Sequence, residues 1–118
     1  RWDREILVEV TTLDQLIARY GEPVFCKIDV EGYELEVLQG LSRPLQGLSV
    51  EFLAGALEQT LGCVDRLESL GSYRYQVVAG EQRSFYLPGW ITAREIRQWL
   101  DDGAGGLASG DLYAQRQD

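Results

Sequence analysis

The sequence of 118 residues has no histidine, no methionine, two cysteines and a single lysine. Without histidine, the chain cannot form a Ser-His-Asp or Cys-His catalytic unit, and it cannot bind a metal ion through imidazole. Cys26 and Cys63 are too few and too far apart in sequence to indicate a disulfide framework or a zinc site. We expect both to be apolar packing residues in a cytoplasmic protein. Any acid–base or metal chemistry therefore has to come from carboxylates.

The sequence begins with Arg1 instead of methionine, and we therefore expect it to be part of a longer chain. Basic residues and long apolar runs are also scarce. Eleven lysines and arginines stand against 19 aspartates and glutamates, which gives a net charge of -8 and no basic stripe for binding phosphates. No apolar run approaches the roughly 20 residues that span a bilayer. We expect neither a nucleic acid nor a membrane as a partner.

What the chain does contain is enough apolar residues for a core, in an order that alternates between strand and helix. Thr12 and Gln15 form a capping box that opens a helix ending near Gly21, and Gly32 precedes a second helix. A third helix carries an apolar stripe and ends near Gly71. The expected strands of this part cover residues 6–10, 24–30 and 48–53. This βαβαβ order predicts an α/β fold with a mostly parallel sheet.

The last third of the sequence predicts a smaller set of elements. Residues 73–78 and 83–87 indicate two strands of an antiparallel hairpin at the edge of the sheet. Thr92 and Glu95 form another capping box, which predicts a helix over residues 93–100. Four glycines between residues 101 and 110 predict a mobile loop.

Candidate site residues follow the expected parallel strands, because ligands bind beyond the carboxyl ends of such strands. Asp29 and Glu31 close the strand at 24–30, and Glu51 lies near the end of its expected neighbour. Residues 29 and 31 share one face while the chain is extended, and Gly32 allows a sharp departure. The carboxylates can act as a general base or hold a hard cation such as Mg²⁺. Alternatively, Asp29 caps the next helix while the two glutamates are solvated or paired with arginine.

Lys27, the only lysine, lies inside the same apolar strand. It has either a catalytic role or a place at the sheet margin, beside a carboxylate. A second group of interest is the set of aromatic residues around the expected hairpin, which can form a platform for a sugar or can simply pack across strands. These aromatic residues are Tyr73, Tyr75, Phe85, Tyr86 and Trp90.

Several segments together resemble the FkbM family of methyltransferases. The most specific is Lys27-Ile28-Asp29-Val30-Glu31-Gly32-Tyr33-Glu34, preceded by Thr11-Thr12-Leu13-Asp14 and followed by Val37-Leu38-Gln39-Gly40. Weaker similarities are Ser49-Val50-Glu51, the Gly80-Glu81 turn with Phe85, and Gly110-Asp111-Leu112-Tyr113-Ala114. The resemblance covers almost the whole chain.

This resemblance implies a class I (Rossmann-like) methyltransferase fold, of which residues 1–118 supply the C-terminal half of a single domain. S-adenosylmethionine is the implied cofactor, and its binding elements are expected upstream of Arg1. The implied catalytic residues are Asp29 and Glu31, with Glu51, Gly32 and Lys27 lining the crevice. A divalent metal such as Mg²⁺ on Asp29, Glu31 and Glu51 is a further expectation. The implied activity is O-methylation of a sugar, glycan or natural-product hydroxyl.

Without the upstream elements, we expect residues 1–118 alone to be inactive and the strand at 24–30 to have one open edge, which favours a homodimer. Two other functions remain possible at this point. One is a non-catalytic module that binds a glycan through the aromatic residues. The other is a structural or assembly half-domain that pairs through its open edge.

Overall fold

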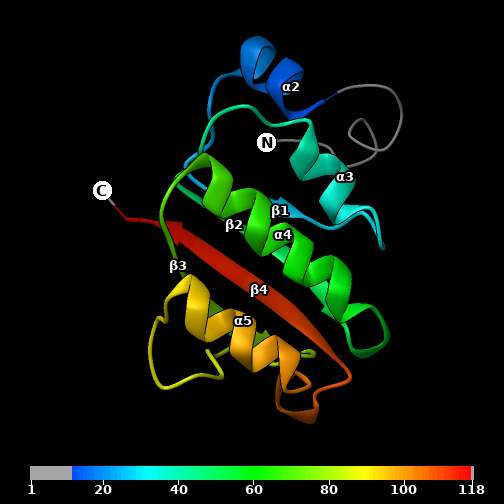
Figure 1. The fold of residues 1–118 in the computed structure, drawn as a ribbon. Coiled ribbons are helices and arrows are strands. Elements are labelled where there is room, and N and C mark those ends of the chain that lie inside the picture. The colour runs from blue at the N-terminus through cyan, green and yellow to red at the C-terminus, as the bar shows by residue number, and fades with distance from the viewer. Residues whose placement is uncertain (1–11, 118) are drawn as a thin grey trace.

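The fold is a four-stranded sheet with helices packed on one of its faces (Figure 1). A computed structural model describes residues 12–117, so the strand expected at residues 6–10 lies outside the described residues. The strands are β1 (Cys26–Ile28), β2 (Gly47–Leu53), β3 (Tyr73–Ala79) and β4 (Ser109–Arg116). The helices are α2 (Leu13–Tyr20), α3 (Glu34–Gln39), α4 (Leu57–Leu70) and α5 (Ala93–Asp101), with short 3-10 turns η1 (Ala54–Ala56) and η2 (Ala104–Gly106).

Both capping boxes predicted from the sequence are confirmed. At the start of α2, Gln15 donates its backbone N–H to the Thr12 hydroxyl, and Thr12 donates its own N–H to the Gln15 side chain, both at 3.1 Å. Thr92 and Glu95 make the same reciprocal pair at the start of α5. Each box satisfies two backbone donors that a helix end would otherwise leave unpaired. Local sequence therefore determines where these two helices begin.

The sheet is mixed, and the prediction of a mostly parallel sheet is wrong. The strand order is β1-β2-β4-β3, in which only β1 and β2 are parallel. Strand β4 runs antiparallel to both of its neighbours, β2 and β3. It lies inside the sheet, between these two strands. Its first two residues, Ser109 and Gly110, belong to the segment that the sequence analysis predicts as a mobile loop. Among the described residues, β1 pairs only with β2 and forms one end of the sheet.

Strand β4 was missed because it lacks the usual composition of a strand. Its buried positions alternate regularly, but two of them are Gly110 and Ala114, and only Leu112 between them is a large apolar residue. Small residues carry little strand propensity of their own. Their value here comes from the neighbours, since β4 hydrogen-bonds along its length to β2 and β3. Tertiary pairing therefore specifies this strand more than its own sequence does.

The expected edge hairpin is only partly confirmed. Strand β3 forms as predicted, but residues 83–87 contribute a single bridge, between Phe85 and Val78. The chain then continues along the same strand, where Ile91 and Tyr75 exchange two backbone hydrogen bonds at 2.8 and 2.9 Å. The outer edge of β3 is therefore covered by an irregular segment and not by a regular strand.

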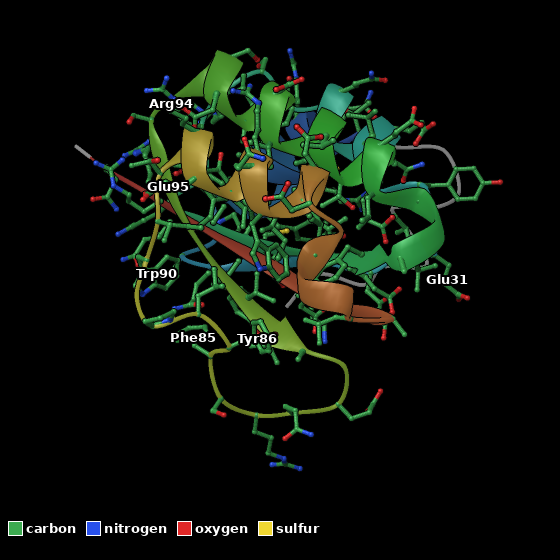
Figure 2. All side chains as sticks on the ribbon, turned by 60° about the horizontal axis from the view of Figure 1, so that its bottom comes forward. Glu31, Phe85, Tyr86, Trp90, Arg94 and Glu95 are labelled. Carbon is green, nitrogen blue, oxygen red and sulfur yellow. The ribbon has the colours of Figure 1, made fainter. Side chains whose placement is uncertain are left out.

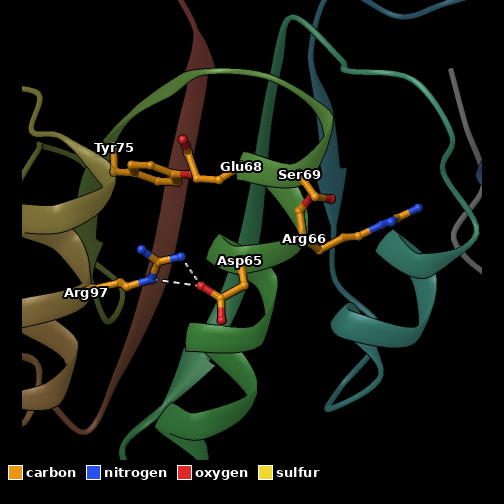
Figure 3. Close-up of polar contacts among 6 residues, drawn as sticks. All are labelled: Asp65, Arg66, Glu68, Ser69, Tyr75 and Arg97. Atoms are coloured by element: carbon orange, nitrogen blue, oxygen red, sulfur yellow. Dashed lines mark hydrogen bonds and ion pairs between the residues drawn. The ribbon is translucent and has the colours of Figure 1, made fainter.

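Helices α3, α4 and α5 lie side by side over the same face of the sheet (Figure 1). Polar contacts tie α4 to its surroundings (Figure 3). The Tyr75 hydroxyl, which is buried, donates to the Glu68 carboxylate of α4 at 2.8 Å. On the other side of α4, Arg66 donates to the carbonyl of Leu41 at 2.7 Å. An exposed ion pair between Asp65 and Arg97 joins α4 to α5, and such pairs contribute little to stability.

Cys26 and Cys63 are free and buried in the core, as the sequence analysis expects. Burial raises the pKa of the Cys26 thiol to about 11. For Cys63, burial and the nearby charges of Glu34 and Glu36 raise the pKa to about 12. Because the folded pKa values lie above the unfolded one, the stabilisation is complete below pH 9 and is lost as pH rises towards 11 and 12.

We therefore expect the two thiols together to lower the free energy of unfolding by about 2 kcal/mol between pH 9 and 10, about 1 kcal/mol each, with a smaller loss from the buried Tyr73 and Tyr75, whose pKa values are also raised. Urea unfolding at both pH values measures this change. The double variant Cys26→Ala, Cys63→Ala is the control, and its stability should change much less over the same interval. An equally steep fall in that variant would assign the alkaline destabilisation to other groups.

Candidate functional site

The candidate site lies where the two parallel strands end side by side. Ile28 of β1 is in register with Val50 of β2, so Asp29 and Glu51 each follow directly after a paired residue. Across the next strand pair, Glu51 is directly opposite Asp111 of β4. Three neighbouring strands thus bring acidic residues to one end of the sheet. The sequence-based expectation that Glu51 lies on the neighbouring strand is confirmed.

The most unusual member of the site is Glu34, the first residue of α3. Its side chain is only 3% exposed. Its Oε1 atom accepts a hydrogen bond from the backbone N–H of Gly32 at 3.0 Å, whereas Oε2 is buried with no hydrogen-bond partner. One carboxylate oxygen from each of Asp29, Glu34 and Glu51 comes within 4.8 Å of the other two. We call these three side chains the carboxylate group.

The electrostatics of the site follow from this crowding. Burial, followed by repulsion from Asp29, Glu34 and Asp111, raises the pKa of Glu51 above its usual range. Burial also raises the pKa of Asp111, although the positive charge of Lys27 acts in the opposite direction. Like charges at short range repel one another, so this end of the sheet favours a bound cation.

A small cavity adjoins the carboxylate group. Its volume is about 20 Å³, and Glu34 and Glu51 line it together with Gly32, Thr60 and Cys63. Space of this size holds one water-sized occupant. The carboxylates of Glu34 and Glu51 and the hydroxyl of Thr60 therefore line one cavity, which lies where α4 packs over the end of β2.

Comparison with known families identifies this chain's relatives. The Methyltransferase FkbM domain matches residues 1–105. The chain belongs to the FkbM methyltransferase family. Among curated proteins there is no match, and among solved structures there is none either. Membership of this family confirms the resemblance inferred from the sequence, supports methyltransferase activity in general and implies S-adenosylmethionine as the methyl donor.

The cavity of this FkbM chain is too small for S-adenosylmethionine, since it holds only one water-sized occupant. The described residues around the carboxylate group therefore do not form a pocket for the methyl donor. The α/β arrangement of the described residues is nevertheless consistent with part of a methyltransferase fold. Within residues 12–117, none of the helices has the length and apolar character needed to cross a membrane.

Glu31 of the FkbM chain does not join the carboxylate group. The chain turns at Glu31 and Gly32, whose φ angles are +49° and +98°. The expected extended geometry, with Asp29 and Glu31 on one face, is therefore wrong. Glu31 is exposed and points away from the body of the molecule (Figure 2). A catalytic or metal-binding role for Glu31 stays a prediction, and the place expected for it beside Asp29 and Glu51 is taken by Glu34.

Lys27 is exposed on the sheet and acts electrostatically on Asp111. Strand register places it opposite Ser49, which in turn is opposite Tyr113 of β4. Because side chains on a strand alternate between faces, these residues lie on the face away from the buried Cys26 and Ile28. Lys27 thus marks the sheet face that α3, α4 and α5 do not cover.

The aromatic residues expected around the hairpin do not form one platform. Tyr73 and Tyr75 are buried in the core and lie two residues apart on the same strand, β3, with ring centroids 6.4 Å apart. Tyr86 packs against Trp99 of α5. A row of four rings lies elsewhere: Phe25 against Tyr113 at 5.7 Å, Tyr113 against Phe85 at 5.6 Å, and Phe85 against Trp90 at 5.3 Å between centroids. Figure 2 shows Phe85 and Trp90 on the segment beside β3. We call these four residues the aromatic row.

Sequence reasoning missed Glu34 and Asp111 as site residues. Glu34 reads as an ordinary acidic residue in the first turn of a helix, and its burial depends on the packing of α3 against α4. Asp111 lies on β4, which was itself missed, so its position opposite Glu51 had no sequence signal. Both residues belong to segments that carry the family resemblance.

Proposed function

We propose that this chain is part of an S-adenosylmethionine-dependent methyltransferase that O-methylates a hydroxyl group of a sugar, a glycan or a natural product. The observation that carries the proposal is the carboxylate group at the ends of two adjacent parallel strands in an FkbM-family chain. Strand ends of this kind are where α/β proteins bind ligands. Carboxylates at this position suit an acceptor whose hydroxyl must lose a proton.

S-adenosylmethionine supplies an activated methyl group when it is bound. The residues of this chain have the complementary task of holding the acceptor hydroxyl and drawing its proton away. The hydroxyl oxygen would then bond to the methyl carbon as the bond from that carbon to sulfur breaks, and the sulfur would leave as a thioether. Asp29 directly follows β1 and belongs to the carboxylate group, which supports it as the residue that acts on the hydroxyl. Glu34, which is buried in the group, fits the role of its partner better than the exposed Glu31.

The aromatic row supports a sugar or similar ring as the acceptor. Phe25, Phe85 and Trp90 are each more than a third exposed, and they meet through Tyr113. Tyr113 lies two residues along β4 from Asp111, which is opposite Glu51. Flat aromatic faces next to polar groups bind sugar rings through their apolar sides. An acceptor on the aromatic row would thus lie over β4, the strand adjacent to β2, which carries Glu51.

We further propose that residues 1–118 form the C-terminal part of one methyltransferase domain, with the donor pocket in elements that precede it. The cavity supports this division, because it has no room for the donor. Free, buried Cys26 and Cys63 support a cytoplasmic location. Among the described residues β1 has a partner on one side only, which makes it a candidate edge for pairing with the preceding elements or with a second copy.

The aromatic row also favours a second candidate function, a glycan-binding module without catalysis. In that case the row matters and the carboxylates do not. The two functions differ in whether the carboxylate group is needed for turnover, which is a property that substitution of Asp29 measures directly.

The proposal is tested with the full-length protein and S-adenosylmethionine labelled on its methyl group. We expect label to appear on hydroxylated acceptors, with sugars and glycans favoured over phenols and amines in a mixed panel. The 118-residue chain alone should transfer no label. If the full-length protein binds glycans but transfers no label to any acceptor, the binding module replaces the enzyme as the better account.

A further inference from the structure

The carboxylate of Glu34 is buried without full hydrogen bonding. Its Oε2 atom is buried without a hydrogen-bond partner in a side chain that is 3% exposed. A buried carboxylate oxygen without a partner is costly, and native proteins nearly always satisfy such atoms. The second oxygen already accepts the N–H of Gly32, so the side chain is held in place by the backbone. The unpaired oxygen therefore requires a partner that can approach it in this position.

The neighbours of the Glu34 side chain are themselves acidic. Oxygens of Asp29 and Glu51 lie within 4.8 Å of a Glu34 oxygen and of one another. Within residues 12–117, neither Glu34 nor Glu51 forms an ion pair with an arginine or lysine side chain. The charges of Glu34 and Glu51 therefore repel each other strongly unless a positive charge lies between them.

The spacing suits an ion with oxygen ligands. Mg²⁺ binds oxygen at about 2.0–2.1 Å in an octahedron, so adjacent ligands are about 3 Å apart and opposite ligands about 4 Å apart. Three carboxylate oxygens within 4.8 Å of one another reach the adjacent spacing if each moves inward by about an ångström. The adjoining cavity, lined by Glu34, Glu51 and Thr60, adds space for a water or a hydroxyl ligand. Ca²⁺ needs six to eight oxygen ligands and is less well served by three side chains.

We propose that Asp29, Glu34 and Glu51 bind one Mg²⁺ ion, with Glu34 Oε2 as a direct ligand. A bound ion satisfies the buried oxygen and neutralises most of the charge on the three carboxylates. Mg²⁺ usually keeps several water ligands, and these positions are open to exchange. Resting on the proposed methyltransferase function, the ion would take the acceptor hydroxyl as a ligand and lower its pKa, which makes the oxygen a better nucleophile.

The test uses the full-length protein with Mn²⁺ alone as a spectroscopic substitute for Mg²⁺, without donor or acceptor. The electron paramagnetic resonance signal of free Mn²⁺ should fall by the equivalent of one bound ion per chain. Added Mg²⁺ should restore the signal by displacing that ion. Glu34→Gln keeps the size of the side chain and its oxygen for the Gly32 N–H, and should weaken Mn²⁺ binding at least tenfold. The matched control is Glu36→Gln, an exposed residue two positions along α3, which should bind Mn²⁺ as the native protein does.

Thermal unfolding provides the second readout. Without metal, Glu34→Gln should melt at or above the temperature of the native protein, because it removes a repelled charge. Added Mg²⁺ should raise the melting temperature of the native protein and of Glu36→Gln, but not that of Glu34→Gln. The proposal is overturned if Mn²⁺ does not bind, or if Glu34→Gln binds it as tightly as the control. Methyl transfer that persists in a chelator, together with absent Mn²⁺ binding, would reject the metal and leave the methyltransferase intact.

Discussion

Asp29→Asn in the full-length protein is expected to lower kcat/KM for methyl transfer by about 100-fold or more, the usual contribution of an acid–base group. Asparagine has nearly the same size as aspartate, so the end of β1 should keep its structure. Asparagine has no negative charge, however, so it cannot take the proton from the acceptor hydroxyl or hold a cation as aspartate does. Steady-state methyl transfer from labelled S-adenosylmethionine measures the change.

Two further variants make this first prediction specific. Glu36→Gln removes an exposed charge from α3 and should retain native kcat/KM. Glu31→Gln separates two expectations, since the sequence places Glu31 in the site and the structure leaves it exposed in a turn. We expect Glu31→Gln to retain activity within about threefold, well short of the loss of a group that acts in the reaction. Unimpaired turnover of Asp29→Asn would favour the glycan-binding module over the enzyme.

Gly110→Ala is expected to destabilise the fold by about 3 kcal/mol, at the upper end of the range for overpacking a tight core. Gly110 is on the central strand β4, between Phe52 and Ala79 of the adjacent strands. A Cβ atom at this position would lie 2.5 Å from the carbonyl oxygen of Val78 and 2.7 Å from the Phe52 ring. The carbonyl belongs to the backbone of β3, so it cannot turn aside without disturbing the sheet.

Urea unfolding measures this second effect, and Gly55→Ala is its control. Gly55 lies in η1, and no atom would come within 4 Å of an added Cβ there. The Gly55 variant should stay within about 0.5 kcal/mol of the native protein, as most surface substitutions do. If Gly110→Ala is as stable as Gly55→Ala, then β4 does not pack between β2 and β3 as described.

The sequence predicted those parts of the fold that depend on local chemistry. The helix starts at Thr12 and Thr92 are set by side chains that bond to their own backbone. The parallel pairing of β1 with β2 follows from an apolar strand, a helix and another apolar strand in succession. The order of the sheet was not predictable in the same way, because β4 consists largely of small and polar residues whose partners lie far away in sequence.

The candidate site was predictable to a similar extent. Asp29 and Glu51 were found from their positions at strand ends, which the register confirms. Glu31 was included on the assumption that the chain stays extended past Asp29, and Glu34 was not considered. Instead, positive φ angles at Glu31 and Gly32 redirect the chain, and Glu34 is the residue that turns inward. Gly32 indicated that a turn was near, but not which side chain would follow it into the site.

The account's central claim is that the carboxylate group acts as one unit in methyl transfer, and a double-mutant cycle on kcat/KM for its members Asp29 and Glu51 tests it most directly. The four proteins are the native enzyme, Asp29→Asn, Glu51→Gln and the variant with both changes. Residues that act as a unit give strongly non-additive effects. We predict that kcat/KM of the double variant is no more than about threefold below that of the less active single variant. Losses that simply multiply in the double variant would contradict the claim, since they would mean that the two carboxylates act independently.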